Sequence, residues 1–342
     1  MSAIDETGTM PADTTGGPYF DDLAVGDKFA DAPAVTLTEG LAAAHQVITG
    51  DRLRLALDHE LAREVCGTAP PAHCALVWDV AIGQSTLATQ RVRANLFYRG
   101  LFFRRFPVLG DTLRTVTEVT GLRENTRRPD RPSTGLVALR ITTTDQHRRV
   151  VLDFWRCAML PLRRGDIGTG HSDDMNTVGP PAGAVVSSAA ALGGWRLDRY
   201  RELVPGRHFD SFEVGQTWRV AGADVVSSAP ELARLTLNVA AVHHDVAAAG
   251  GRRLVYGGHT IGLALAQICR IIPTIVTVAG WQSCDHVGPV HEGDELASVV
   301  TVRGKEPLPG GGGLLHLQVS VVAHTDDASS DVLDWQFAAI LA

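Results

Sequence analysis

The sequence has few cysteines, no long hydrophobic run and no leader-like block of basic and apolar residues. Its five cysteines are odd in number and form no Cys-x-x-Cys pair. This argues against a disulfide framework and favours buried free thiols in a reducing cytoplasm. No apolar run is long enough to span a bilayer, so we expect no membrane insertion. The first 18 residues lack the blocks of a signal peptide and predict a disordered tail.

Positive charge is also scarce. The chain carries 31 Lys and Arg against 38 Asp and Glu, a net charge of −7. Nucleic acids and anionic membranes attract clustered basic residues, so we expect neither as a partner. A hydrophobic content of 45% with 20% charged residues is typical of a soluble globular protein. At 342 residues there is room for two domains, each with its own core.

What the sequence does contain is an internal repeat. Three motifs recur at a nearly constant offset of 181 to 189 residues, which predicts a tandem duplication of one domain. The paired segments are Phe20–Gly26 with Phe209–Gly215, Pro107–Leu113 with Pro289–Leu296, and Val151–Leu160 with Val332–Leu341.

The composition along the chain predicts where the repeats begin and end. Residues 1–18 form the tail, 19–162 the N-terminal domain and 205–342 the C-terminal domain. Residues 163–204 are rich in Gly, Asp, Ser, Pro and Ala at their start and predict a linker. Its length would let the second domain pack beside the first as a pseudo-dimer.

Each repeat has the same predicted order of elements. An apolar helix is expected at about 75–86 and again at 260–272, where Pro273 ends it. Ser228–Glu231 has capping-box spacing with a proline near the start of another helix. Strands are expected at 112–122, 135–144 and 150–160, and at 295–303, 314–323 and 332–341. A buried helix followed by antiparallel strands predicts an α+β fold with a sheet wrapped around that helix.

This order of elements resembles the hotdog fold, and the motifs resemble those of MaoC-type enoyl-thioester hydratases. The similar pieces are Phe20–Gly26, Pro107–Leu113 and the segment around His243. Asn238–His243 followed by Arg253–His259 is closer still to the double-hotdog subgroup that contains mesaconyl-CoA hydratase. The resemblance covers both repeats. It implies a double-hotdog α+β protein that hydrates an enoyl thioester or dehydrates a (3R)-hydroxyacyl thioester.

The MaoC-type motif supplies an Asp, a His five residues later and a glycine turn at a helix start. In the second repeat the His is His243, which can take and return a proton near neutral pH. The Asp position holds Asn238, which can hold a water or hydroxyl but cannot act as an acid or base. We expect both to be catalytic, with Gly257 and Gly258 binding the thioester oxygen at the positive helix end. The other predicted substrate-binding residues are Tyr256, His259 and Asp245.

The first repeat keeps the opposite half of the motif. Asp51 is present, but the histidine position holds Ala56, and Pro70–Cys74 stands where the glycine turn should be. Prolines remove backbone donors, so this site is expected to be degenerate. We therefore predict one working site per chain, in the second repeat, with the first-repeat site becoming room for the acyl group.

Several other polar residues have plainer interpretations. The histidines and aspartate near His243 lack a tight ligand cluster, so no metal is predicted. The basic run Arg123–Arg131, with Arg104 and Arg105, could meet CoA phosphates, although a solvated loop is favoured. Asp111 and Asp294 follow a glycine before a strand and are interpreted as turn residues.

The resemblance thus implies a cytoplasmic hydro-lyase that needs no cofactor, because the thioester itself acidifies the α-proton. Its expected partner is an acyl-CoA or acyl-carrier-protein thioester, and it would be a monomeric pseudo-dimer or a homodimer. Two alternatives stay open. A hotdog thioesterase would need a carboxylate such as Asp245 or Asp285 aimed at the thioester carbonyl. A non-catalytic acyl-thioester binder would be consistent with Asn238 in place of Asp.

Overall fold

The computed structural model describes residues 16–67, 69–180, 191–325 and 328–342. Residues 1–15 of the predicted tail and residues 181–190 of the predicted linker lie outside this description. The elements before the linker are η1(Phe20–Asp22), β1(Lys28–Phe29), β2(Val35–Thr36), α1(Glu39–Thr49), α2(Arg54–Leu57), α3(His59–Cys66), α4(Cys74–Gln84), η2(Ser85–Thr89), β3(Ala94–Phe103), β4(Thr112–Glu124), β5(Thr134–Thr144) and β6(Val150–Pro161).

The second half repeats this order around a second long helix. The elements are η3(Met175–Thr177), α5(Leu197–Leu203), η5(Phe209–Ser211), β7(Thr217–Arg219), β8(Asp224–Val225), α6(Ala229–Leu235), η6(Ala241–His243), α7(Gly257–Ile271), β9(Ile275–His286), β10(Glu295–Pro307), β11(Gly313–His324) and β12(Ser329–Leu341). Because η3 and α5 fall within residues 163–204, the predicted linker is partly structured.

The strands of the described residues form one continuous antiparallel sheet. Its order is β1-β4-β5-β6-β3-β9-β12-β11-β10-β7, with β2 beside β4 and β8 beside β10. The order on one side of the β3–β9 junction mirrors that on the other. At the junction Tyr98 lies opposite Cys284 and Leu101 opposite Trp281. The two repeats are therefore joined edge to edge, each half-sheet extending the other.

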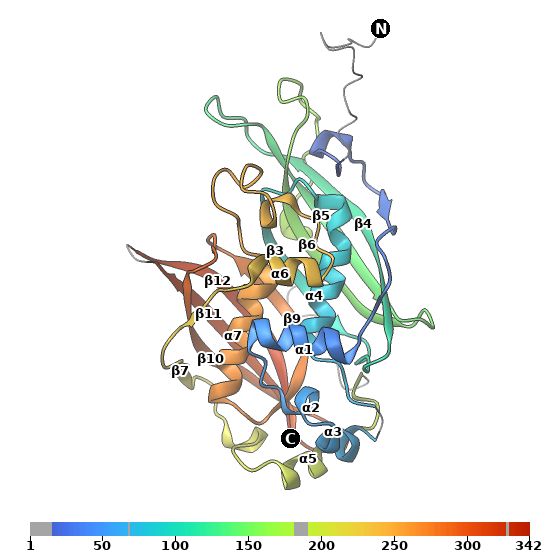
Figure 1. Ribbon diagram of the computed structural model, residues 1–342, viewed down its shortest axis with the longest axis vertical. Helices are drawn as coiled ribbons and strands as arrows, with labels where there is room; N and C mark the ends of the chain where they lie inside the picture. Colours follow the sequence, from blue (N-terminus) through green and yellow to red (C-terminus); the bar gives the residue numbers. More distant parts are fainter. Residues whose placement is uncertain (1–15, 68, 181–190, 326–327) are drawn as a thin grey trace.

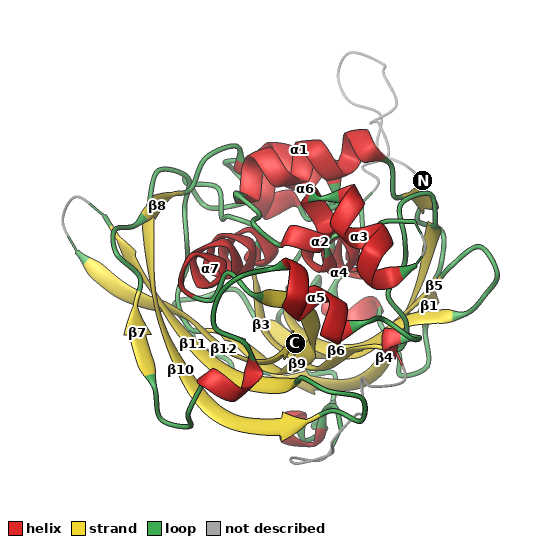
Figure 2. Cartoon of the chain, turned by 90° about the horizontal axis from the view of Figure 1, so that it is seen from below, coloured by secondary structure: helices red, strands yellow, loops and turns green. Residues whose placement is uncertain are grey.

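The sheet curves around its helices, as the prediction of a sheet wrapped around a helix requires. Figure 2 shows all the long helices on the concave face of the sheet, and Figure 1 shows α4 and α7 side by side there. Every residue of α4 is buried, and so is nearly all of α7. A helix that is apolar all round belongs inside a core.

Three tryptophans connect α4 with strands of the other repeat. The ring of Trp78, on α4, lies 4.7 Å from that of Trp281 on β9 and 6.4 Å from that of Trp335 on β12. All three side chains are fully buried, and the pairs are edge-to-face. Such contacts add to the stabilisation from apolar burial, so the helix of one repeat is anchored in the sheet of the other.

Two strands and one cap differ from the sequence predictions. The strands β3 and β9 were not predicted, since both are largely buried, contain an interior glycine and show no clear alternation. The prediction of a capping box at Ser228–Glu231 is wrong. Ser228 has a left-handed backbone and does not cap α6, whereas Glu292 accepts the Ala229 N–H at 3.1 Å. The five cysteines are free, as predicted, and four of them are buried.

Gly83 allows a close approach between the two repeats. It lies on α4, where a Cβ would collide with the backbone carbonyl of Thr236. We expect Gly83→Ala to lower the free energy of unfolding by roughly 2–3 kcal/mol, because the backbone must move. The control Gly40→Ala, on α1 in open space, should raise it by up to about 1 kcal/mol through helix propensity. Urea unfolding of both variants checks this, and equal effects would contradict the close contact.

Candidate active site

A cavity of about 370 Å³ lies between the two repeats. The first repeat supplies one wall from α4, η2, β3 and β6, and the second supplies the other from the segments around Asn238 and Tyr256. Four of the predicted site residues line this cavity: Asn238, His243, Tyr256 and Gly257. The cavity is therefore built from different parts of the two repeats, not from the same motif of each.

The loop that carries Asn238 and His243 rests on the first repeat. The Val239 N–H donates to Thr86 Oγ1 at 3.0 Å, and the Ala241 N–H donates to the Gln90 carbonyl at 2.9 Å. Both acceptors belong to the segment that follows α4. Because backbone hydrogen bonds fix the path of the loop, the first repeat positions residues of the second-repeat motif.

The imidazole of His243 is held as a neutral base. Its Nδ1 lies 2.9 Å from the Leu254 carbonyl, which can only accept, so Nδ1 carries the proton and Nε2 keeps its lone pair. Burial lowers the pKa of His243 to about 4, with the Leu254 hydrogen bond opposing that shift. The ring is therefore uncharged at neutral pH and can accept a proton there.

Asn238 presents an amide to the cavity. Its Oδ1 accepts the Ala240 N–H at 3.0 Å, and its backbone carbonyl lies 2.6 Å from His244 Nε2. Leu237, just before it, has a φ of 60°, an unusual backbone for a branched residue that redirects the chain there. Within the described chain no group accepts from Asn238 Nδ2 in a hydrogen bond, so this donor is free for a ligand.

The N-terminus of α7 reaches the cavity through Gly257. Its N-cap residue, Tyr256, makes no side-chain cap, and the first N–H groups of a helix have no partner within it. A side chain at Gly257 would strike the ring of His286. Gly258, expected to bind the thioester oxygen, is not part of the cavity wall, and its Cα packs against Asp79 and the ring of Tyr256.

Tyr256 is held by a buried polar chain. Its hydroxyl donates to Asp79 Oδ1 at 2.9 Å, and Asp79 Oδ2 lies 3.0 Å from His45 Nε2. Asp79 and His45 come from α4 and α1 of the first repeat and are inaccessible to solvent. Burial, and then the Asp79 carboxylate, raise the pKa of Tyr256 well above its usual value. Tyr256 therefore stays a neutral phenol whose position depends on the other repeat.

Two predicted site residues lie elsewhere. Asp245 is exposed and accepts the Ala247 N–H at 2.8 Å, so it organises its own turn. His259 is fully buried outside the cavity wall, and neither ring nitrogen has a partner among the described residues. Asp245 lies in a turn after η6, and His259 lies on α7 on a side that does not face the cavity.

The structure adds polar wall residues that the motifs did not indicate as site residues. They come from η2, β3 and β6 of the first repeat and from the end of β9, and they are Thr89, Asn95, Tyr98, Arg156 and His286. Arg156 lies in the strand motif Val151–Leu160, where Asp153 and Arg156 are the two charged residues. The charge of Arg156 inside a buried strand was the available signal.

The residues of the first-repeat motif make contacts within the fold. Asp51 Oδ1 lies 2.7 Å from His73 Nε2 and accepts the Leu53 N–H at 2.8 Å. His73 also caps α4 by accepting the Ala75 N–H, and Asp58 caps α3. The hollow around Asp51 shares no lining residue with the cavity, and the expectation that it extends the acyl site stays a prediction.

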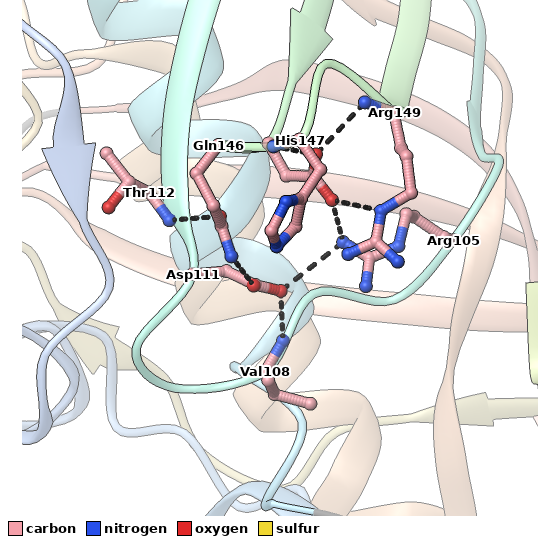
Figure 3. Close-up of polar contacts among 8 residues, drawn as sticks. Arg105, Val108, Asp111, Thr112, Gln146, His147 and Arg149 are labelled. Carbon is pink, nitrogen blue, oxygen red and sulfur yellow. Dashed lines mark hydrogen bonds and ion pairs between the residues drawn. The ribbon is translucent and has the colours of Figure 1, made fainter.

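Arg105 does not serve as a free phosphate ligand. Figure 3 shows it beside Asp111, which also accepts the Val108 N–H at 3.0 Å and so forms the predicted turn. Arg105 and Arg149 both contact the buried Asp145, at 2.6 and 2.8 Å. Burial raises the pKa of Asp145, but hydrogen bonds from the backbone and side chain of Arg149 outweigh it and keep that pKa below its usual value.

The rest of the basic run lines a surface groove next to the cavity. Its cationic residues are Arg93, Arg123, Arg127, Arg128 and Arg131. Arg93 lines both the cavity and this groove, so the two hollows adjoin at Arg93. Arg127 and Arg131 have carboxylate partners in Glu124 and Asp130, whereas Arg123 and Arg128 have none among the described residues.

In the described parts of the chain, no group of three or more His, Cys, Asp or Glu side chains is arranged to hold a metal ion. None of the helices found there has the length and apolarity needed to cross a membrane.

A curved sheet enclosing a long helix, duplicated and joined edge to edge, is the double hotdog fold, and the cavity between its repeats carries a base, an amide and a helix N-terminus. Comparisons with known proteins agree. The chain is 30% identical to mesaconyl-CoA hydratase from Cereibacter sphaeroides over 323 residues, 91% of each protein. It is 27% identical to β-methylmalyl-CoA dehydratase from Chloroflexus aurantiacus over 333 residues, 94% of this chain and 92% of that one. No family model matches.

Solved structures give the same result. A conserved hypothetical protein from Mycobacterium tuberculosis, described as a double hotdog, is 53% identical with a TM-score of 0.90 over 96% of this chain and 99% of that one. A protein described as a MaoC domain dehydratase, from Chloroflexus aurantiacus, has a TM-score of 0.83 at 24% identity over 96% and 99%. The chain belongs to the MaoC-like double-hotdog family that includes mesaconyl-CoA hydratase.

The buried histidines make stability depend on pH. Burial lowers the pKa of His243, His259 and His286 to about 4, below the ordinary 6.5. The unfolded chain then binds more protons than the folded one between pH 4 and 6.5. Stability is thus full above pH 6.5 and falls as pH drops through that window, by up to about 1.4 kcal/mol per pH unit for each histidine.

The pH effect can be checked by urea unfolding at pH 7.0, 5.5 and 4.5. His259→Phe removes one of the three titrating groups without touching the cavity wall, so its stability should vary less with pH. An unchanged slope in this variant would show that His259 does not titrate with a lowered pKa.

Proposed function

We propose that this chain is a hydratase/dehydratase that interconverts an enoyl thioester and its (3R)-hydroxyacyl thioester. The observation that carries the proposal is the neutral His243, with Nδ1 committed to Leu254 and the ring on the cavity wall beside Asn238 and the α7 N-terminus. Both curated relatives are named for a hydratase or dehydratase acting on a CoA thioester. The handedness of the hydroxyl rests on that family relationship.

The residues suit each step of the reaction. In hydration, Asn238 Nδ2 holds the water and His243 Nε2 takes one of its protons. The water oxygen bonds to the β-carbon, and the double-bond electrons move to the thioester oxygen. The Gly257 N–H and the helix dipole stabilise that oxygen as it becomes negative. The imidazolium then gives its proton to the α-carbon, which restores the thioester and the neutral histidine. Dehydration is the reverse.

The reaction needs no redox or metal cofactor, because the thioester carbonyl accepts the electrons and acidifies the α-proton. Asn238 is suited to this reaction, because an amide can hold the water while His243 performs both proton transfers. The Tyr256 phenol, fixed by Asp79, completes the wall around the reacting carbons.

Removal of the base should greatly slow turnover. We expect His243→Ala to lower kcat/KM for enoyl-CoA hydration by about 10²–10⁴-fold, the usual contribution of general acid–base catalysis. The control His147→Ala removes an exposed histidine in the β5–β6 turn and should retain wild-type activity. The loss of absorbance at the enoyl band measures both. An active wild type whose rate survives His243→Ala would overturn the assignment.

The same assay separates the alternatives. The binder hypothesis is favoured by Asn238 and predicts CoA-thioester binding without any change at the enoyl band. A thioesterase would release free thiol. It lacks support, because Asp245 is exposed in its own turn and Asp285 forms an ion pair with Arg99 at 2.7 Å.

We further propose that the thioester is carried by coenzyme A, with its phosphates in the arginine-lined groove that begins at Arg93. Arginines without carboxylate partners are well suited to phosphate recognition. The double variant Arg123→Ala, Arg128→Ala should raise KM for an enoyl-CoA by about 10-fold at low ionic strength. An N-acetylcysteamine thioester lacks the nucleotide and should show no change. Equal changes for both substrates would contradict the phosphate role.

A further inference from the structure

The cavity wall holds a second histidine, His286, at the last position of β9. It lines the cavity together with His243 and Gly257. Backbone pairing with Leu333 of β12 fixes the strand there, and the imidazole meets the ring of Tyr98 edge to face at 5.9 Å. The catalytic motif supplies only one histidine, so His286 is an imidazole for which the reaction steps above have no role.

The two ring nitrogens of His286 differ in access. Nε2 is buried and has no hydrogen-bond partner among the described residues. Nδ1 also makes no hydrogen bond to a described group, but it is not a buried atom, so it is open to the cavity that the residue lines. A buried N–H without an acceptor is rarer in proteins than a buried acceptor without a donor. The neutral ring therefore keeps its proton on Nδ1 and presents a hydrogen-bond donor to the cavity.

His286 is uncharged at neutral pH. Burial lowers its pKa to about 4. In the described parts of the chain no carboxylate forms an ion pair with it, and the adjacent Asp285 pairs with Arg99 at 2.7 Å instead. The N–H of a neutral imidazole is a very weak acid, so it donates a hydrogen bond without giving up its proton. His286 is thus suited to be a donor, whereas His243, with a free lone pair on Nε2, is suited to be a base.

This donor lies beside the helix end that is expected to receive the thioester oxygen. A Cβ at Gly257 would lie 2.5 Å from both Cε1 and Nε2 of the His286 ring. Since Nδ1 is bonded to Cε1, the accessible nitrogen is one bond away from an atom that packs against Gly257. The helix α7 begins at this glycine, and its first N–H groups have no partner within the helix. A backbone donor and a side-chain donor therefore lie at the same corner of the cavity.

Packing alone does not account for an imidazole at this position. Histidines with a structural role in the second repeat have a nitrogen close to a backbone carbonyl, as His208 has with Val204 at 2.9 Å and His291 with Arg253 at 2.8 Å. His286 has no such bond. A leucine would fill similar space without burying an unpaired nitrogen, and that burial costs free energy. The open Nδ1 is the part of the ring that a ligand can use.

We propose that His286 is a catalytic residue whose Nδ1–H joins the Gly257 N–H as a second donor to the thioester oxygen. As water adds to the β-carbon, the double-bond electrons move to that oxygen, and both hydrogen bonds strengthen as its negative charge grows. The proton stays on Nδ1 of His286 throughout. His243 takes the proton of the water and returns it to the α-carbon. This inference rests on the proposed hydratase function.

Two substitutions of equal shape isolate the donor. Leucine and asparagine both branch at Cγ, but only asparagine can place an N–H where Nδ1 of the imidazole lies. With crotonyl-CoA as substrate, we expect His286→Leu to lower kcat by about 10²–10³-fold, the usual cost of one oxyanion donor, and to change KM by less than about 5-fold. His286→Asn should recover at least about 10-fold of that loss. Equal kcat values for the two variants would overturn the proposal, because packing does not distinguish them.

Glutamine tests which nitrogen acts. Its amide reaches the position of Nε2, so the kcat of His286→Gln should stay closer to that of His286→Leu than to that of His286→Asn. A better recovery by glutamine than by asparagine would overturn the assignment of Nδ1. The control His316→Leu removes a half-buried histidine of β11 that does not line the cavity, and it should leave kcat and KM unchanged. If His286→Leu fails to fold, the two amide variants carry the comparison, with His286→Asn at least about 5-fold faster.

A thioester that cannot be hydrated separates this inference from the proposed function. Butyryl-CoA with a ¹³C label at the carbonyl carbon reports hydrogen bonds to the carbonyl oxygen, which move its NMR resonance downfield. We expect a downfield shift on binding to the wild type, a smaller shift with His286→Leu and a restored one with His286→Asn.

The outcomes of this binding experiment are distinct. The expected pattern, in a wild type that hydrates no crotonyl-CoA, would support the hydrogen bond and refute the hydratase. The same shift in the wild type and in His286→Leu would refute the role of His286 and leave the hydratase standing. A wild type that neither binds butyryl-CoA nor hydrates crotonyl-CoA would refute both.

Discussion

The pairing of β3 with β9 is the contact on which the rest of the structure depends. It joins two half-sheets into one, so that α4 and α7 share a single concave face. Only then can the end of α4 receive the loop that begins at Thr236, whose carbonyl lies where a Cβ at Gly83 would be. Neither repeat could enclose the cavity by itself, because each supplies one wall.

This arrangement explains why the two copies of the motif have diverged. In the first copy the residues of the motif make structural contacts: Asp51 pairs with His73, and His73 caps α4. Other residues of the first repeat contact the second-repeat motif: Thr86 accepts from the Val239 N–H, and Asp79 accepts from the Tyr256 hydroxyl. A duplicated domain can lose its own chemistry and still be retained, because its surface completes the partner site.

Much of this fold could be predicted from the sequence, because repeated motifs bracket each buried helix and its strands. The junction strands could not, since strands buried on both faces lack the alternation that marks an ordinary one. At the site, Asn238 and His243 line the same cavity, as their motif predicts. Asp245 and His259 lie outside its wall, because residues close in sequence point in different directions. Arg156 was missed as a site residue because a strand from the other repeat carries it, and no local pattern reports that.

The buried polar groups divide by whether the protein itself satisfies them. Asp79 has Tyr256 and His45, and Asp145 has Arg105 and Arg149. Those groups shape the fold. Arg156 Nε, Asn95 Nδ2 and His286 Nε2 instead have no hydrogen-bond partner among the described residues, and all three residues line the cavity. Because buried polar groups are normally satisfied, the cavity wall keeps polar atoms that a bound ligand or water can satisfy.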